Sequence, residues 1–182
     1  MTDDELKTLV ASLAVAQKAT DAQLKETDAQ LKATGRKLDK IAKLIGGISA
    51  NQGDVAEAFF FNSLAGDTRL GSICFDDIEK NSHKRRGSIE EEYDIIMTNG
   101  EVVGIVEVKY KAHDHDLDRL DRKMRHFKQM FPWFKTYKQY GAIASFHIHD
   151  EAKESALQRG YFVLQRSGNV LHTEQGKTLQ VM

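Results

Sequence analysis

The sequence predicts an α/β domain, a mixed β-sheet flanked by helices, preceded by a long N-terminal coiled-coil helix. Three features predict this: a seven-residue repeat through the first 48 residues, an Asn99-Gly100 hairpin signal, and alternating strand and helix patterns around it. Aromatic residues are absent from residues 1–45 and frequent from Phe59 onward. We therefore place a coiled-coil oligomerisation helix at 1–48 and one globular domain at 49–182.

The composition argues against several classes of protein. A net charge of −1 is not that of a generally basic nucleic-acid-binding protein, although it is compatible with a local basic face. Cys74 is the only cysteine, so neither an intrachain disulfide nor a cysteine-rich zinc site can form. The N-terminus is acidic, and no apolar run reaches the roughly 18 residues of a membrane span. We expect a cytoplasmic protein with no membrane partner.

Two tracks of apolar and semi-apolar residues in the first segment alternate by three and four, as in a left-handed coiled coil. The track at position a contains Val10, Gln17, Leu24, Leu31, Leu38 and Ile45, and the track at d contains Leu6, Leu13, Thr20, Thr27, Thr34, Ile41 and Ile48. A polar helix of this length buries such a stripe by self-association, which predicts a homo-oligomer. The alternative is a single helix that folds back on its own domain. Gly46 and Gly47 mark the boundary and can act as a hinge.

The elements of the globular domain follow from hydrophobic periodicity and turn residues. The first part predicts a helix over 51–64, a strand over 69–75, a basic loop over 83–88, and strands over 93–98 and 101–110. The second part predicts a helix over 114–131 that Pro132 bends or restarts, a strand over 140–147, a helix over 150–159 and a strand over 161–165. This order is typical of a mixed sheet covered by helices.

The hairpin brings charged side chains onto one face of the sheet. A two-residue turn at Asn99-Gly100 places Asp94 opposite Ile105. Because side chains alternate along a strand, Asp94, Glu107 and Lys109 then project from the same side, with the two carboxylates on the order of 7 Å apart. Two carboxylates at that separation can share a divalent cation.

The surroundings of these residues are apolar. The 102–108 segment reads as an interior strand, in which Glu107 needs a compensating partner. Glu57 lies on the apolar stripe of the preceding helix and needs one too. A cation held beside Lys109 would supply this compensation. The alternative is a structural ion pair between Glu107 and Lys109, with Asp94 merely starting a strand.

The residues Tyr93-Asp94 and Glu107-Val108-Lys109, with twelve residues between them, resemble the active-site hairpin of the PD-(D/E)XK nuclease superfamily. That group includes restriction endonucleases and archaeal Holliday-junction resolvases. The resemblance extends to the element order between Asn51 and Gln165, including a preceding helix whose glutamate matches Glu57, and it leaves out the coiled coil. Tyr93 stands where the motif has its proline.

The resemblance implies a restriction-endonuclease-like fold and a Mg²⁺- or Mn²⁺-dependent endodeoxyribonuclease. Asp94 and Glu107, with the backbone carbonyl of Val108, would ligate the metal, and Glu57 would bind it directly or through water. Lys109 would orient the attacking water and stabilise the charge that develops on the phosphate. The second hypothesis is a non-catalytic oligomeric adaptor that uses a nuclease-like fold to bind DNA or a protein.

Two basic clusters are candidates for contacts with DNA phosphates, although such clusters are often only solvated faces. They consist of Lys84, Arg85 and Arg86 before the hairpin, and Arg119, Arg122, Lys123, Arg125 and Lys128 on the following helix, opposite its apolar stripe. The sequences His113-Asp114-His115-Asp116 and His147-Ile148-His149-Asp150 suggest either metal ligands or residues at strand ends and helix N-caps.

Overall fold

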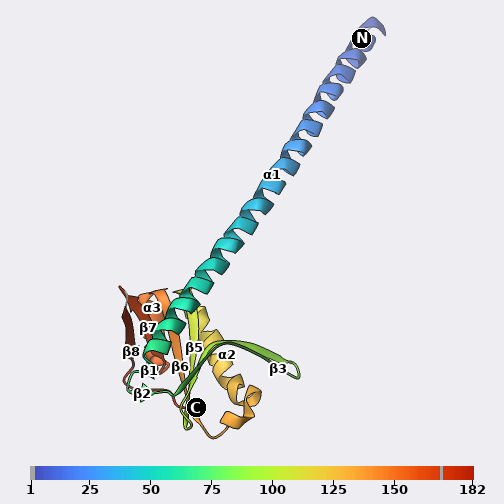
Figure 1. Cartoon of the computed structure of the whole chain (residues 1–182). Helices are drawn as coiled ribbons and strands as arrows, with labels where there is room; N and C mark the ends of the chain where they lie inside the picture. Colours follow the sequence, from blue (N-terminus) through green and yellow to red (C-terminus); the bar gives the residue numbers. More distant parts are fainter. Residues whose placement is uncertain (1–2, 169) are drawn as a thin grey trace. The chain divides into compact units, whose positions relative to one another are not determined.

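The structure is a computed structural model that describes residues 3–168 and 170–182. The chain divides into two compact units, residues 1–49 and 50–182. Helix α1 covers Asp3–Gly66, so it supplies the described part of the first unit and the beginning of the second (Figure 1). The helix continues through Gly46 and Gly47, where the sequence suggested a hinge. A glycine inside a helix costs only about 1 kcal/mol relative to alanine, which this segment tolerates.

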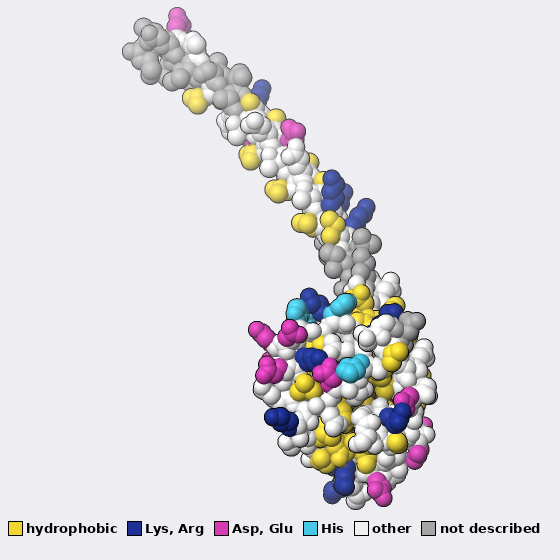
Figure 2. All heavy atoms as spheres, turned by 90° about the vertical axis from the view of Figure 1, so that its left-hand side faces the viewer, with side chains coloured by type: hydrophobic (Ala, Val, Ile, Leu, Met, Phe, Trp, Pro, Cys, Tyr) yellow, Lys and Arg dark blue, Asp and Glu magenta, His cyan; other side chains and the backbone are white. Residues whose placement is uncertain are grey.

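The heptad stripe of the first unit lies at the helix surface. Five of its apolar residues expose between 52% and 67% of their surface, namely Leu13, Leu24, Leu31, Leu38 and Ile41. Figure 2 shows hydrophobic side chains recurring along this helix. The side chains of Leu6, Val10, Ile45 and Ile48 lie outside the described part. The coiled coil stays a prediction. None of the described helices is long and apolar enough to cross a membrane.

The second unit is built on a six-stranded mixed sheet with the strand order β3-β4-β5-β6-β7-β8. Its strands are β3 (Asp77–Arg86), β4 (Ile89–Thr98), β5 (Val102–Ala112), β6 (Lys138–Ile148), β7 (Phe162–Ser167) and β8 (Val170–Gln175). Strand β6 is parallel to β5 and β7, and the other neighbours are antiparallel. A separate hairpin pairs β1 (Arg69–Leu70) with β2 (Ile73–Cys74).

Helices cover both faces of this sheet (Figure 1). On one face, α2 (Asp114–Met130) and α3 (Asp150–Gln158) bury their apolar sides against a core that includes Ile105. On the other face, the end of α1 buries Phe60 and Leu64 against a core that includes Val106. Neighbouring residues of β5 thus point into different cores, as strand alternation requires. The predicted α/β class with a mixed, helix-flanked sheet is confirmed.

Three local expectations differ from the structure. Residues 83–86 belong to β3 rather than to a loop, because basic residues of β3 pair with Glu90, Glu91 and Glu92 of β4 and the chain turns at Gly87. The strand expected over 69–75 is interrupted by a turn at Gly71, which has a φ of 59°. Strand β8 was not predicted. After α2, the chain restarts as a short 3-10 helix at Pro132–Phe134.

The register of the β4–β5 hairpin differs from the predicted one by two residues. The connection contains three residues, with Gly100 at a φ of 86°, and it pairs Thr98 with Val103. Asn99 stabilises this loop because its Oδ1 accepts hydrogen bonds from the backbone amides of Glu101 and Val102. A two-residue turn at this position was therefore wrong. Because the register is shifted by two residues, and side chains alternate with a period of two, every side chain keeps the predicted face of the sheet.

Candidate active site

Asp94 lies at the point where β4 and β5 separate. The last residue pair of their ladder is Ile95 with Val106, one step before Asp94. Instead of continuing the backbone ladder, Asp94 accepts a hydrogen bond at Oδ2 from the backbone amide of Val108, at 2.7 Å. The end of the β4–β5 ladder and the bond from the Val108 amide thus hold the Asp94 carboxylate beside β5.

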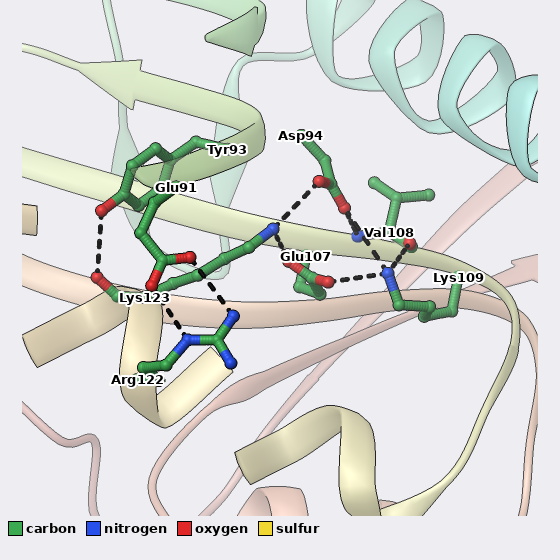
Figure 3. A network of polar contacts seen from close by, with 8 residues as sticks. All are labelled: Glu91, Tyr93, Asp94, Glu107, Val108, Lys109, Arg122 and Lys123. Atoms are coloured by element: carbon green, nitrogen blue, oxygen red, sulfur yellow. Dashed lines mark hydrogen bonds and ion pairs between the residues drawn. The ribbon is translucent and has the colours of Figure 1, made fainter. Parts of the chain in front are cut away.

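The ammonium group of Lys109 lies close to three oxygen atoms of the two strands (Figure 3). Its Nζ lies 2.7 Å from Glu107 Oε1, 3.0 Å from the carbonyl oxygen of Val108 and 4.0 Å from Asp94 Oδ2. The same three groups are the metal ligands that the family resemblance implied. Glu107 is 1% exposed, whereas 23% of the Lys109 side chain is exposed. The ammonium group therefore sits at the border between the buried carboxylates and the solvent.

Lys123 supplies a second ammonium group from the opposite side. Its Nζ donates to Asp94 Oδ1 at 3.2 Å and to Glu107 Oε2, and its side chain is 6% exposed. The sequence interpretation placed Lys123 on the solvated basic face of α2, which is wrong. The position follows Leu120 by three residues and precedes Phe127 by four, so helical periodicity puts it on the buried stripe. That spacing was the signal that could have found it.

Asp94, Glu107, Lys109 and Lys123 line an open cavity with a volume of about 420 Å³. Glu57 of α1 lines the same cavity. Burial and the neighbouring carboxylate of Asp94 raise the pKa of Glu57. Within the described ranges, however, no set of three or more His, Cys, Asp or Glu side chains is placed to hold a metal ion. Asp94 and Glu107 form a pair, and Glu57 is a residue of the cavity wall.

The site is electrically balanced by its own side chains. The carboxylates of Asp94 and Glu107 face the ammonium groups of Lys109 and Lys123. Burial, and then repulsion by Glu107, raise the pKa of Asp94. For Lys123, burial lowers the pKa, but attraction to Glu107 and Asp94 is stronger, so the pKa is raised overall.

A second ion cluster fastens β4 to α2 next to the site. Arg122 donates from Nε and Nη2 to the two oxygens of Glu91, at 2.9 and 3.3 Å, and His126 Nδ1 lies 2.8 Å from Glu91 Oε1. The hydroxyl of Tyr93 donates to the backbone carbonyl of Lys123 at 3.3 Å. Tyr93, at the position of the motif's proline, therefore ties the hairpin to the helix that carries Lys123.

Several members of the predicted DNA-contacting clusters have partners within the protein. Lys84 lies over the rings of Trp133 and Phe131, at 4.9 and 5.1 Å from their centres. Lys128 donates to the carbonyl oxygen of Met182 at 3.0 Å. Arg122 is held by Glu91, as described above.

The other basic residues are distributed around the domain. Arg119 is exposed and lines the cavity that contains Asp94 and Glu107. Arg85 and Arg86 are exposed near the β3–β4 turn, and Arg125 lines a different cavity. Arg119 and Arg122 are thus the exposed members of the predicted set that line this cavity, and Arg122 is held by Glu91.

Two of the predicted histidine candidates begin helices. His113 precedes α2 and His149 precedes α3, each directly after one of the parallel strands β5 and β6. Their ring centres lie 5.1 Å apart, and His115 stacks on His113 at 5.6 Å. Their places match the alternative in which such histidines stand at strand ends and helix N-caps.

The residues of the hairpin fit a divalent cation by their chemistry. Carboxylate and carbonyl oxygens are the ligands that Mg²⁺ and Mn²⁺ prefer. Here Asp94 Oδ2, Glu107 Oε1 and the carbonyl oxygen of Val108 all surround one positively charged atom, the Nζ of Lys109. The oxygens are therefore already arranged around a cationic position at the wall of an open cavity.

Comparisons with known proteins add little to this geometry. No protein-family model matches the chain, and no curated protein sequence matches it. Among solved structures, the chain is similar to a repair endonuclease from Pyrococcus abyssi, with 18% sequence identity and a TM-score of 0.44. The match covers 61% of this chain and 46% of that one, less than half of its length. A likeness of this size carries no argument about function, which rests on the side chains described above.

Proposed function

We propose that the domain is a nuclease that depends on a divalent cation and hydrolyses phosphodiester bonds of DNA, and that its coiled coil makes it an oligomer. One observation carries the catalytic part. Three oxygens from Asp94, Glu107 and Val108 converge on a single cationic position at the wall of an open cavity. This is the arrangement that the PD-(D/E)XK resemblance implies for the metal-binding hairpin.

Asp94, Glu107 and the carbonyl of Val108 would hold the Mg²⁺ or Mn²⁺ ion, and Glu57, which lines the same cavity, would bind it directly or through water. When bound, such an ion acidifies a water molecule and polarises the phosphate. Lys109 contributes a positive charge and three N–H donors at the edge of the cavity. It can therefore orient the attacking water and stabilise the negative charge that develops on a phosphate oxygen.

The charge of the cavity wall supports the need for a cation. The cavity is lined by six Asp or Glu residues and four Lys or Arg residues, so the carboxylates outnumber the cations and repel a phosphodiester that approaches them. A divalent ion reverses this repulsion at the point where the phosphate must bind. Arg119, on the same wall, would contact the DNA backbone without reading its bases.

The proposed oligomer rests on the first unit of the chain. Leu24, Leu31 and Leu38 recur every seven residues and each exposes 60% of its surface or more. A second copy of the same helix offers a matching stripe, and association removes these leucines from water. The heptad spacing therefore favours self-association as the way to cover them.

The experiment uses the full chain with supercoiled, linear duplex and single-stranded DNA, in Mg²⁺ or Mn²⁺ and in EDTA. We expect cleavage of at least one DNA form, its loss in EDTA, and a decrease of about 100-fold or more in Glu107→Gln. Glu174→Gln is the matched control, because it removes a carboxylate that is also paired with a lysine, Lys153, at 2.6 Å. Cleavage that continues in EDTA, or that Glu107→Gln leaves unchanged, contradicts the proposed mechanism.

A non-catalytic adaptor is the second candidate, and one observation favours it. Lys109 and Lys123 already pair with Asp94 and Glu107, so these two carboxylates have cationic partners without a metal ion. Thermal unfolding separates the two functions. A nuclease site that binds Mn²⁺ raises the midpoint temperature by mass action, and Glu107→Gln removes the effect. An adaptor shows no such rise and binds its partner equally well in EDTA.

A further inference from the structure

The two carboxylates of the site divide their oxygens between two cationic positions. Asp94 directs Oδ2 toward Lys109 and Oδ1 toward Lys123 (Figure 3). Glu107 does the same, with Oε1 on Lys109 and Oε2 on Lys123. Each carboxylate thus bridges two positive charges that come from different elements, strand β5 and helix α2.

Two carboxylates that bridge two cations form the framework of a two-metal site, in which the ions lie about 3.5–4 Å apart. In this protein, side chains supply both charges. We call the position of the Lys109 ammonium the outer position and that of the Lys123 ammonium the inner position. We infer that Lys123 permanently fills the inner position and serves as the second positive charge. The site then accepts one divalent cation, at the outer position. The inference rests on the proposed function because it concerns the same metal site.

The two lysines differ in the freedom to leave their positions. Both lysines line the open cavity, but the Lys109 side chain is 23% exposed, so its ammonium can shift to the edge of the cavity when a cation takes its place. The Lys123 side chain is 6% exposed and projects from a helix that is packed by Leu120, Met124 and Phe127. To vacate its position, Lys123 would have to leave two carboxylates, both of which it contacts more closely than Lys109 contacts Asp94.

The oxygens that each lysine receives also differ. Around Lys109 there is a backbone carbonyl, that of Val108, in addition to the two carboxylates, which makes three hard oxygen ligands. Around Lys123 there are the two carboxylate oxygens, and the hydroxyl of Tyr93 fastens the lysine's own backbone. The outer position is therefore the better metal site, and the inner one is suited to a fixed ammonium group.

The test measures the number of Mn²⁺ ions bound by the full chain and their affinity, using the electron paramagnetic resonance signal of free Mn²⁺. We expect one ion per wild-type chain at this site. In Lys123→Met, which has a similar shape and no charge, we expect a second ion or at least about tenfold tighter binding, because a positive charge has left the carboxylates. Lys123→Gln provides the same readout should the methionine variant fail to fold.

Arg119→Met is the matched control, because it removes one positive charge from the same cavity wall. We expect its Mn²⁺ affinity to change much less than that of Lys123→Met, since charges that face solvent are screened. Two ions in the wild-type protein, or equal affinities in wild type and Lys123→Met, would overturn the role of Lys123 and leave the proposed nuclease standing. Absence of Mn²⁺ binding in all of these proteins would remove both proposals.

Discussion

The two units of this chain depart from the usual distribution of polar and apolar groups in opposite directions. The long helix exposes leucines, with Leu31 at 67%, while the domain buries Glu107 at 1% exposure. Exposed leucines lower the free energy when another apolar surface covers them, whereas buried charges must be satisfied within the fold. In the proposed oligomer a second helix covers these leucines from outside, whereas the charges of the site are paired with one another inside the domain.

The largest expected effect comes from breaking the internal balance. Glu107→Ala leaves the buried ammonium of Lys123 with one carboxylate instead of two, which we expect to lower the free energy of unfolding by about 3–5 kcal/mol. Urea unfolding at pH 7 measures the loss. Glu174→Ala removes a partly exposed carboxylate of another lysine pair, and we expect less than about 1 kcal/mol. Equal losses in the two variants would show that burial does not distinguish these pairs.

The next effect concerns the partner of the helix. Leu31→Glu places a charge at an a position, and losing one buried leucine costs about 1.5–3 kcal/mol per copy. We expect the dissociation constant of the oligomer to rise by at least about 100-fold, as measured by analytical ultracentrifugation, with no change in the midpoint temperature of the domain. Ala29→Glu, at the opposite f position, serves as the control. A wild-type chain that sediments as a monomer would contradict the proposed oligomer directly.

A smaller effect depends on pH. Burial would raise the pKa of Glu91, but hydrogen bonds from Arg122 and His126 outweigh it and lower the pKa overall. Stability from this group is therefore present above its unfolded pKa of about 4.3 and is lost as the pH falls through the lower folded value. We expect Glu91→Gln to be less stable than wild type by about 1.5–3 kcal/mol at pH 7, with a smaller difference below about pH 4. A difference that is constant with pH would exclude an ionic contribution.

The smallest effect concerns the loop that sets the register. Asn99 accepts two backbone hydrogen bonds at Oδ1, and its Nδ2 donates to the carbonyl of Cys74 at 2.7 Å. We expect Asn99→Ala to lower the free energy of unfolding by about 1 kcal/mol, measured by urea unfolding, since these bonds are partly exposed. The face of Asp94 stays fixed by the pairing of β4 with β3, and the face of Glu107 by the pairing of β5 with β6. A gross loss of stability would mean that the loop alone holds the hairpin.

The sequence predicted the parts of the fold in which one periodic pattern was unambiguous. Helices α2 and α3 and strands β5, β6 and β7 lie within a few residues of their expected positions because apolar spacing defines them. Strand β8 was missed because its residues, apart from Val170 and Leu171, are polar, as suits the edge of a sheet. The paired basic and acidic ends of β3 and β4, residues 83–86 and 89–92, were missed because charges hide strand alternation.

The candidate site could be predicted only as far as local geometry reaches. Asp94, Glu107 and Lys109 lie on neighbouring strands, and side-chain alternation placed them together even with an incorrect turn. Lys123 comes from a helix, and its approach depends on how α2 packs on the sheet. Grouping it with other lysines by charge, instead of by its angle on the helix, concealed it. Tertiary packing decided which of the basic residues entered the site.

The hydrogen bond from the backbone amide of Val108 to Asp94 gives the domain a built-in spectroscopic reporter. This amide proton has a carboxylate oxygen as its acceptor, so its nuclear magnetic resonance frequency depends on the charge that the carboxylate carries. Whatever protonates Asp94, or attracts it elsewhere, changes that frequency without any label in the cavity. The state of the site can therefore be followed from the main chain.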